Sequence, residues 1–204
     1  MSDSVLAPKE ALVYVERIQV PSALSWRDLQ PGLAPEAIRA DLVLQVCGKE
    51  VRFPQIHYGF GFASDSPTSL KGILQAVVAL EEGRDSYWRA SHGGVLMTRL
   101  QLSKDPAEHF EIFVFDDAHL YFTYHTNHGG ALALDALLSV PTLVQSEERA
   151  TELLIEQLDE RDALADLNEW RRRYRGRWEH LKSRALSLSG HLLSFVPSTD
   201  LPIA

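Results

Sequence analysis

The sequence has little cysteine and no long apolar run, and each absence excludes a class of protein. Cys47 is the only cysteine among the 204 residues, so an intrachain disulfide and a four-cysteine zinc site are both excluded. No apolar run approaches the roughly 20 residues that a membrane-spanning helix needs. The first residues lack the basic start and apolar stretch of a secretion signal. We therefore expect a cytoplasmic protein with no membrane association.

The chain also lacks the short motifs that mark common enzyme classes. The patterns G-x-S-x-G, H-E-x-x-H and S-x-x-K, the EF-hand loop and the Walker phosphate loop are all absent. The segment from Tyr58 to Phe62 has two glycines two residues apart, without the other positions of a phosphate loop. We therefore expect no cofactor, and lean towards a protein without catalytic activity.

Composition and charge point to an ordinary globular protein. Hydrophobic residues make up 45% of the chain and charged residues 24%, which predicts a packed core in a single domain, 1–204, with a helical subdomain over 146–190 as an option. The net charge of −8 disfavours binding to nucleic acid or anionic lipid, and suits a basic protein partner.

Strand patterns dominate the first quarter of the chain. Ala11 to Val20 is rich in Val, Ile and Tyr and predicts a strand, and 21–40 carries three prolines and predicts a loop. Next comes a hairpin over 42–53, with Gly48-Lys49 as a type II′ turn. That turn pairs Val46 with Val51 and Leu44 with Phe53, with all four on one face.

Cys47 in the hairpin and Pro54 just after it each lead to a separate prediction. Cys47 lies at the end of an apolar run, so we expect a small, buried strand residue rather than a nucleophile. Pro54 has no N–H to donate, so its strand should lie at a sheet edge or contain a bulge there.

A helix is predicted over about 67–82. Ser66 is a natural N-cap with Pro67 at the first helical position, and Gly83 ends the helix. Apolar residues recur at helical spacing between these ends, so this helix should cover one face of the sheet.

Three more strands are predicted over 95–102, 110–115 and 120–124, joined by short connections as an antiparallel meander. A tight turn near Asp117 would place four aromatic or aliphatic residues on one face: Phe113, Phe115, Leu120 and Phe122. The segment 131–144 is ambiguous between helix and strand, because its composition favours helix and Pro141 would end that helix.

The C-terminal part, about 146–188, is predicted to be helical, with Ser146 as its N-cap and a break near 159–162. Its second half carries one apolar stripe, formed by Leu167, Trp170, Tyr174, Trp178, Leu181, Ala185 and Leu188. Strands followed by helices predict an α+β fold. We expect an antiparallel sheet of about five or six strands with one covering helix.

Histidines gather between residues 119 and 128. His119 and His125 share a face of one predicted strand, but a straight strand would separate them by about 20 Å, too far to share an ion. Only His125 and His128 could then bind a metal together, and polar histidines without a metal are the more common case. His92-Gly93-Gly94 and His128-Gly129-Gly130 resemble an oxyanion-hole motif in composition, but flexible turns account for both.

Arginines and aromatic residues alternate between 170 and 178. Residues 169–184 carry seven Lys or Arg and two Glu, a net +5, which leaves −13 for the rest of the chain. Arg171 to Arg177 could bind nucleic acid, but a basic helix pairing with the acidic segment 147–168 explains the same pattern.

These observations favour a non-enzymatic protein-binding module, such as an inhibitor, an immunity-type antagonist, a chaperone or an adaptor. Tyr87 and Trp88 are the candidate partner-binding residues. One alternative is a small metal-dependent or hydrolytic enzyme using the region from His119 to His128, and a weaker one is nucleic-acid binding. The sequence leaves the partner's identity and a homodimer open.

Overall fold

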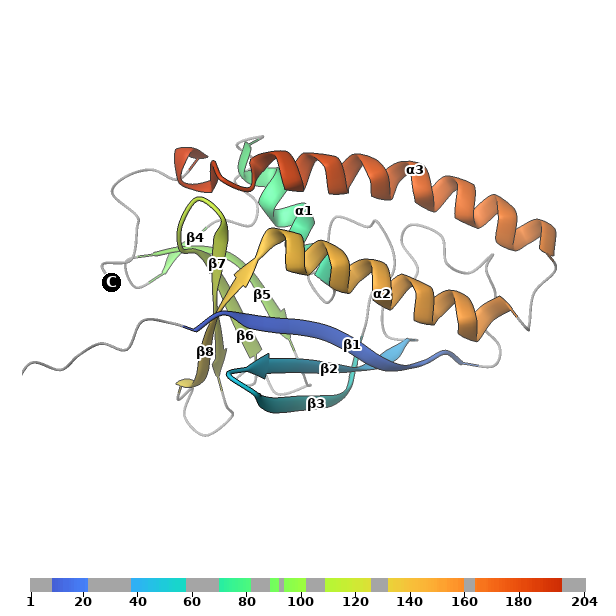
Figure 1. The fold of residues 1–204 in the computed structure, drawn as a ribbon, viewed down its shortest axis with the longest axis horizontal. Helices are drawn as coiled ribbons and strands as arrows, with labels where there is room; N and C mark the ends of the chain where they lie inside the picture. Colours follow the sequence, from blue (N-terminus) through green and yellow to red (C-terminus); the bar gives the residue numbers. More distant parts are fainter. Residues whose placement is uncertain are drawn as a thin grey trace, which may run out of the picture.

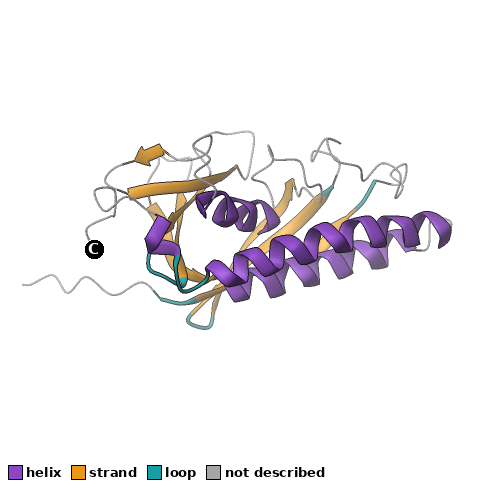
Figure 2. Cartoon of the chain, turned by 90° about the horizontal axis from the view of Figure 1, so that it is seen from above, coloured by secondary structure: helices purple, strands orange, loops and turns teal. Residues whose placement is uncertain are grey.

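The computed structural model describes residues 9–21, 38–57, 70–81, 89–91, 94–101, 109–125, 132–159 and 164–195. Figure 1 shows the arrangement: two long helices lie side by side above the strands, and a short helix lies between them and the sheets. The view from above in Figure 2 shows the same pair of helices along one side of the strands. The predicted α+β fold with antiparallel sheets is confirmed.

Three strands form the first sheet. β1 (Ala11–Gln19), β2 (Arg39–Val46) and β3 (Lys49–His57) are antiparallel in the order β1-β2-β3. The predicted first strand and the hairpin are thus confirmed. The predicted loop at 22–37 lies outside the described residues.

The hairpin turn is one residue earlier than the sequence predicts. Cys47 and Gly48 occupy its centre, both at positive φ, 51° and 76°, which is a type I′ rather than a type II′ turn. The register is therefore Val46 with Lys49, Leu44 with Val51 and Leu42 with Phe53. The apolar residues keep their face, because the pairing moves by two residues. Cys47 is exposed, so the expected burial of its side chain is wrong.

Pro54 meets both expectations for a strand proline. β3 is the last strand of its sheet, and the register shifts between Ala40 and Leu42, opposite Pro54 and Gln55. Gln55 has a φ of 56° in this bulge. Its backbone N–H donates to the buried carboxylate of Asp41 at 3.0 Å, so the bulge supplies a hydrogen bond that a regular strand would not.

Five strands form the second sheet. They follow one another as an antiparallel meander: β4 (Arg89–Ser91), β5 (Gly94–Gln101), β6 (His109–Val114), β7 (His119–His125) and β8 (Leu132–Ser139). The two sheets meet where the Leu137 N–H of β8 donates to the Lys9 carbonyl at 2.9 Å, just before β1. The predicted three-stranded meander is confirmed and lies within this larger sheet.

The register of β6 and β7 differs from the prediction. Val114 pairs with Leu120 and Ile112 with Phe122, across a loop formed by 116–118. Leu120 and Phe122 therefore share the core face with Val114 and Ile112, and not with Phe113 and Phe115. The longer loop explains the change, because one residue more or less between two strands moves the partners to the opposite face.

The segment whose sequence was ambiguous between helix and strand forms a strand, followed by the first residues of a helix. β8 ends at Ser139, and α2 (Val140–Asp159) begins at the next residue. Pro141 lies in the first turn of α2 and does not end a helix, in keeping with the tolerance of early helical positions for proline. The N-cap is Ser139, whose hydroxyl accepts the Thr142 N–H at 3.2 Å. The expected cap, Ser146, is buried inside α2.

The other helices agree with their patterns. α1 (Leu70–Glu81) fits within the predicted 67–82, whose capping residues Ser66 and Pro67 lie outside the described range. α3 (Leu164–Leu188) follows the predicted break, and the described part of its apolar stripe is buried: Tyr174, Trp178, Leu181, Ala185 and Leu188.

The end of α3 is attached to the loop between β6 and β7. Gly190, at a φ of 100°, ends the helix, and its N–H donates to the Asp117 carbonyl. The Leu193 N–H of η3 (Leu192–Phe195) donates to the Asp117 carboxylate at 3.1 Å. One loop residue therefore fixes the direction in which the chain leaves α3.

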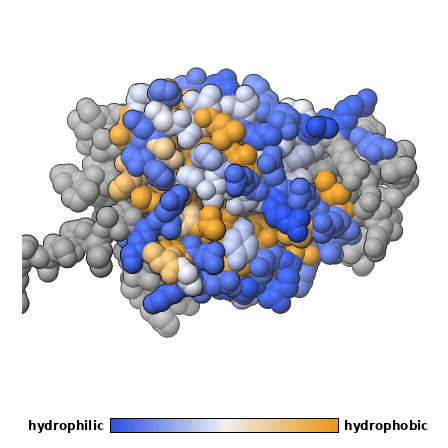
Figure 3. Space-filling view, viewed as in Figure 1, coloured by the Kyte–Doolittle hydropathy of each residue, from blue (hydrophilic) through white to orange (hydrophobic). Residues whose placement is uncertain are grey.

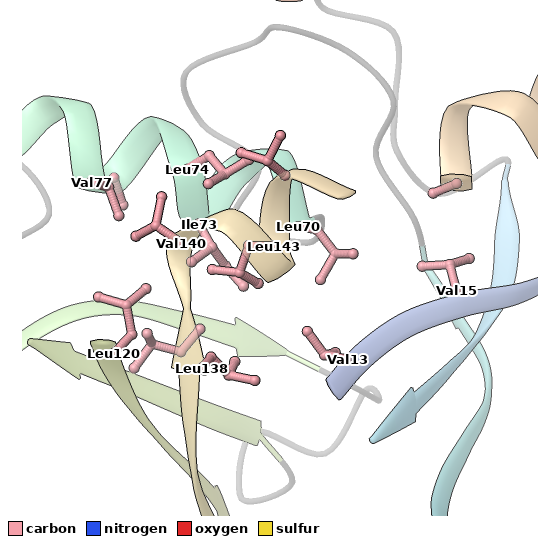
Figure 4. Close-up of a cluster of buried hydrophobic side chains, with 14 of the residues drawn as sticks. Val13, Val15, Leu70, Ile73, Leu74, Val77, Leu120, Leu138, Val140 and Leu143 are labelled. Atoms are coloured by element: carbon pink, nitrogen blue, oxygen red, sulfur yellow. The ribbon is translucent and has the colours of Figure 1, made fainter. Parts of the chain in front are cut away.

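A shared core joins both sheets to the helices. Figure 4 shows side chains from β1, α1, β7, β8 and the start of α2 pointing into one cluster, with Leu70, Ile73 and Leu74 of α1 near its centre. Burying such side chains is the main driving force of folding. In Figure 3, the orange apolar areas of the visible face are interspersed with blue hydrophilic ones. Within the described residues, no helix is both long enough and apolar enough to cross a membrane.

A lysine and a glutamate are buried between the helices. Lys71 of α1 and Glu147 of α2 are fully buried, with Nζ and Oε1 3.9 Å apart. Lys71 Nζ also lies 5.2 Å from the ring centroid of Tyr174 in α3. Burial lowers the pKa of Lys71 to about 8, against the opposing effect of Glu147. These polar contacts join three helices at one point.

Candidate metal centre

Polar side chains occupy the outer face of the β6–β7 pair, opposite the core. Along β6, Phe110 and Ile112 are buried in the core, so His109 and Glu111 project to the other face. On β7 the same alternation places Thr123 and His125 on that face. The register pairs His109 directly with His125 and Glu111 with Thr123. Two residues from each strand thus form a compact square.

The two histidines converge on one carboxylate. His109 Nε2 lies 3.4 Å from Glu111 Oε1, and His125 Nε2 lies 3.3 Å from Glu111 Oε2. The imidazole rings stack with centroids 4.9 Å apart and planes 12° from parallel. Both rings therefore present the same nitrogen to the same acid.

Thr123 completes the square with its hydroxyl. Thr123 Oγ1 lies 3.1 Å from His125 Nε2, and donates to the Glu111 main-chain carbonyl at 3.4 Å. A hydroxyl that donates its proton to a carbonyl can still accept one from an imidazole N–H. In this arrangement the hydroxyl holds the His125 ring beside the carboxylate.

The side chains of this cluster are largely, but not completely, buried from solvent. The exposed fraction of the side chain is 10% for His109, 12% for Glu111 and 21% for His125. One ligand atom from each of the three residues lies within 4.8 Å of the other two. Two imidazoles and one carboxylate form the ligand set of catalytic zinc sites and of non-haem iron sites.

The neighbouring pair on the same face has a different character. The Tyr121 hydroxyl donates to Asp135 Oδ2 on β8 at 2.9 Å. Burial and this carboxylate raise the pKa of Tyr121 to about 12, so its phenol stays protonated. Asp135 thus accepts the Tyr121 hydroxyl through one of its two oxygens.

The structure places His119 away from this cluster, at the opposite end of β7. Its Nδ1 lies 3.0 Å from Asp116 Oδ1, in the loop between the strands. That carboxylate also accepts the backbone N–H groups of Ala118 and His119, each at 2.8 Å. The expectation that His119 and His125 cannot share an ion is confirmed by their positions on β7.

Several candidates fall outside the described residues. His128, the expected partner of His125, is among them, as are Tyr87, Trp88 and the segment 58–62. Of the two His-Gly-Gly motifs, only Gly94 at the start of β5 is described. These expectations stay predictions.

The described arginines of the segment 171–177 do not all lie on one side of α3. Arg172, Arg175 and Arg177 are exposed, and the side chains of Arg171 and Arg173 lie outside the described part. Successive helical residues differ by about 100°, so Arg177 lies about 160° around α3 from Arg175. The acidic and basic helices do pair, since Lys182 Nζ lies 2.9 Å from Glu148 Oε1.

Sequence reasoning missed His109 and Glu111. A His-x-Glu pattern on a strand does place both side chains on one face, and this was the available signal. Their meeting with His125 depends on the register of β6 and β7, which the local sequence did not reveal. Comparison with protein-family models, curated sequences and solved structures found no match for this chain.

Proposed function

We propose that the protein binds a divalent transition-metal ion through His109, Glu111 and His125, and acts as a metal-dependent protein. The observation that carries the proposal is the convergence of two imidazole nitrogens on the two oxygens of one carboxylate. This proposal departs from the expectation of no cofactor. It replaces the pair His125 and His128 with a ligand set from adjacent strands.

Zinc is the ion that suits these ligands best. Imidazole is a borderline donor that prefers zinc, copper, iron or nickel, whereas calcium and magnesium prefer sites made of oxygen ligands alone. Zinc binds more tightly than iron or manganese to a site of this type. A His₂Glu set is also one that zinc uses with only three protein ligands.

Only a small adjustment is needed to seat the ion. Ligand atoms at zinc–ligand distances of about 2.0–2.1 Å lie about 3.4 Å apart in a tetrahedral site. The two nitrogen–oxygen separations, 3.4 and 3.3 Å, match that value, although they join His109 and His125 to different oxygens of Glu111. One ligand atom from each residue lies within 4.8 Å of the other two, so the imidazoles have to move closer together to share one ion with one of those oxygens.

The test is a zinc titration of protein first treated with a chelator and then freed of it. We expect one zinc ion per chain, and an affinity at least about 100-fold lower for His109→Ala, His125→Ala and Glu111→Gln, since even loss of groups that support metal ligands costs 10–100-fold. His119→Ala is the matched control, because His119 also lies on β7 and faces a carboxylate, that of Asp116, but has no second imidazole beside it. Circular dichroism would verify that each variant folds.

Two results would contradict the proposal. One is a wild-type protein that binds no zinc at micromolar concentrations. The other is a His109→Ala, His125→Ala double variant that binds as tightly as the wild type. In either case the square would be a largely buried, hydrogen-bonded polar cluster on that face of the sheet.

The protein-binding role favoured by composition stays a prediction, because Tyr87 and Trp88 lie outside the described residues. Nucleic-acid binding through Arg171 to Arg177 also stays a prediction, because the side chains of Arg171 and Arg173 lie outside the described part of the chain.

A further inference from the structure

Four polar side chains form a cluster where α1, α2 and α3 meet, and we call it the Lys71 cluster. One comes from α1, two from α2 and one from α3: Lys71, Glu147, Thr151 and Tyr174. Lys71 and Glu147 are fully buried, and Tyr174 is 8% exposed. α1 is buried along almost its whole length, and Lys71 is its only charged residue before the last position. An ionisable group thus lies deep inside the helical layer.

Hydrogen bonds within this cluster connect α2 with α3. The hydroxyls of Thr151 and Tyr174 lie 2.9 Å apart, and the Tyr174 hydroxyl donates to Glu147 Oε1 at 3.5 Å. Lys71 Nζ lies 3.9 Å from the same oxygen. Burial and the Glu147 carboxylate raise the pKa of Tyr174 well above its usual value, so the phenol stays protonated. Glu147 therefore keeps a donor in Tyr174 whether or not Lys71 carries a proton.

Charged and titratable neighbours reach Lys71 from α2 and α3. Glu147 acts on its charge directly, and Tyr174 places its ring 5.2 Å from Nζ. Glu148, the next residue of α2, binds α3 through Trp178 and Lys182. η3 also packs against α1 and carries no titratable side chain, and the side chains of β5, which packs there too, lie outside the described residues.

α3 is the helix that covers this cluster from the outside. In Figure 1 it lies beyond α1 and α2, farthest from the first sheet. Proteins open locally as well as globally, and outer elements open at a lower free energy than central strands. Displacement of α3 would remove Tyr174 from Lys71 and let water reach the ammonium group.

We propose that α3 is a pH-sensitive cover of the Lys71 cluster, which closes more tightly as the pH rises above neutral. With α3 closed, burial lowers the pKa of Lys71 to about 8 from the usual 10.5, against the opposing effect of Glu147. Between these two values, opening of α3 takes up a proton. Rising pH opposes that uptake and so favours the closed state, whereas below about 8 the equilibrium no longer depends on Lys71.

Hydrogen exchange of the α3 backbone amides tests this proposal on the full-length protein. Exchange is followed from about pH 7 to about pH 10.5, and each rate is divided by that of an unstructured peptide of the same sequence, which removes the direct effect of pH. We expect the protection of α3 to rise about tenfold for each pH unit above about 8, because opening takes up one proton. The amides of β6 and β7 should be more protected than those of α3 at every pH.

Two variants assign the response to Lys71. Lys71→Arg keeps a positive charge that is not lost in this pH range, so its α3 protection should not rise. The double variant Lys71→Met, Glu147→Met has no ionisable pair and should show no rise either. Lys182→Met is the matched control, because its partly exposed pair with Glu148 lies outside the cluster, and it should keep the wild-type rise.

Each part of the proposal can fail separately. A wild-type protection that stays level or falls above about pH 8 would overturn it, and this result needs no variant to fold. A wild-type rise that persists in Lys71→Arg would assign the proton to another group and overturn the role of Lys71. Equal protection of α3 and of β6 and β7 would show that α3 opens only when the whole protein unfolds, so that it is not a separate cover.

Discussion

His109 and His125 face each other across β6 and β7, with their rings stacked 4.9 Å apart and both Nε2 atoms directed at Glu111. Neither strand contains this arrangement alone. It arises because the β6–β7 register pairs His109 with His125 and places Glu111 beside both. The relationship also shows what a metal ion must displace, namely the contacts that now hold the two imidazoles in position.

Thr123→Val should strengthen zinc binding by about two- to tenfold. The Thr123 hydroxyl lies 3.1 Å from His125 Nε2, the atom that would bind zinc, so it competes with the ion. A hydrogen bond of this kind contributes about 0.5–1.5 kcal/mol, which sets the size of the effect. Valine keeps the shape of the side chain, and zinc titration measures the change. A weaker affinity in Thr123→Val would show instead that the hydroxyl orients the ligand when zinc is bound.

Lys71→Met and Glu147→Met should each destabilise the protein strongly, by about 3–5 kcal/mol, because each leaves a charge in a dry interior. Both side chains are fully buried and lie 3.9 Å apart. The double variant should recover most of the loss, because two apolar side chains of similar size need no charged partner. Urea unfolding of the four proteins measures the coupling. Lys182→Met is the control: its partly exposed pair with Glu148 should contribute at most about 1 kcal/mol.

The contribution of Asp116 to the free energy of unfolding should depend on pH. Burial would raise the pKa of this carboxyl, but hydrogen bonds from Ala118 and His119 outweigh that effect and lower it below the usual 3.8. A group whose pKa is lower in the folded state stabilises the protein above its unfolded pKa, and that contribution is lost as pH falls through the folded pKa. The wild type should therefore exceed Asp116→Asn in unfolding free energy at pH 7, and the difference should shrink below pH 3.8.

Asparagine keeps an oxygen that can accept the two backbone N–H groups, so Asp116→Asn removes the charge with little loss of shape. Asp116→Ala removes the acceptor as well and should be less stable than Asp116→Asn at every pH. A gap between wild type and Asp116→Asn that stays constant down to pH 2 would contradict the assigned role of the charge.

Cys47→Asn should stabilise the protein by about 0.5–1 kcal/mol. Cys47 has a φ of 51° in a type I′ turn, and Asn-Gly is the pair that such turns prefer. Non-glycine residues other than Asn and Asp pay about 1–2 kcal/mol for this left-handed conformation. Thermal unfolding measures the gain, with Cys47→Ala as the control that keeps the strained backbone. An equal melting temperature for Cys47→Asn and Cys47→Ala would show that this turn is not strained.

Local patterns predicted most elements of the fold but not their partners. The apolar stripe of α1 and the Val-, Ile- and Tyr-rich composition of β1 each belong to a single segment, and both elements were predicted from sequence. By contrast, the turn at Cys47-Gly48 was placed one residue too late, because Gly48 suits either of two turn types. β8 was ambiguous because its Ala- and Leu-rich composition favours helix, whereas pairing with β7 makes it a strand.

The candidate site depends on how strands pair, which local patterns do not reveal. His125 was singled out for its neighbours in sequence, yet its structural neighbours, His109 and Glu111, lie 14 to 16 residues earlier. A three-residue loop at 116–118 decides which residues of β6 meet it. The expected tight turn put Phe113 and Phe115 on the core face, and with that parity the square on the outer face could not be predicted.

The attachment of Asp117 to Gly190 and Leu193 has a consequence for synthesis of the chain on the ribosome. Leu188 and Leu192 belong to the same core as Ala11 and Val13, and Asp117 holds the residues that place them. Until nearly 195 residues have left the exit tunnel, the sheets lack part of their apolar cover. The final packing of this core can therefore form only after α3 and η3 have been synthesised.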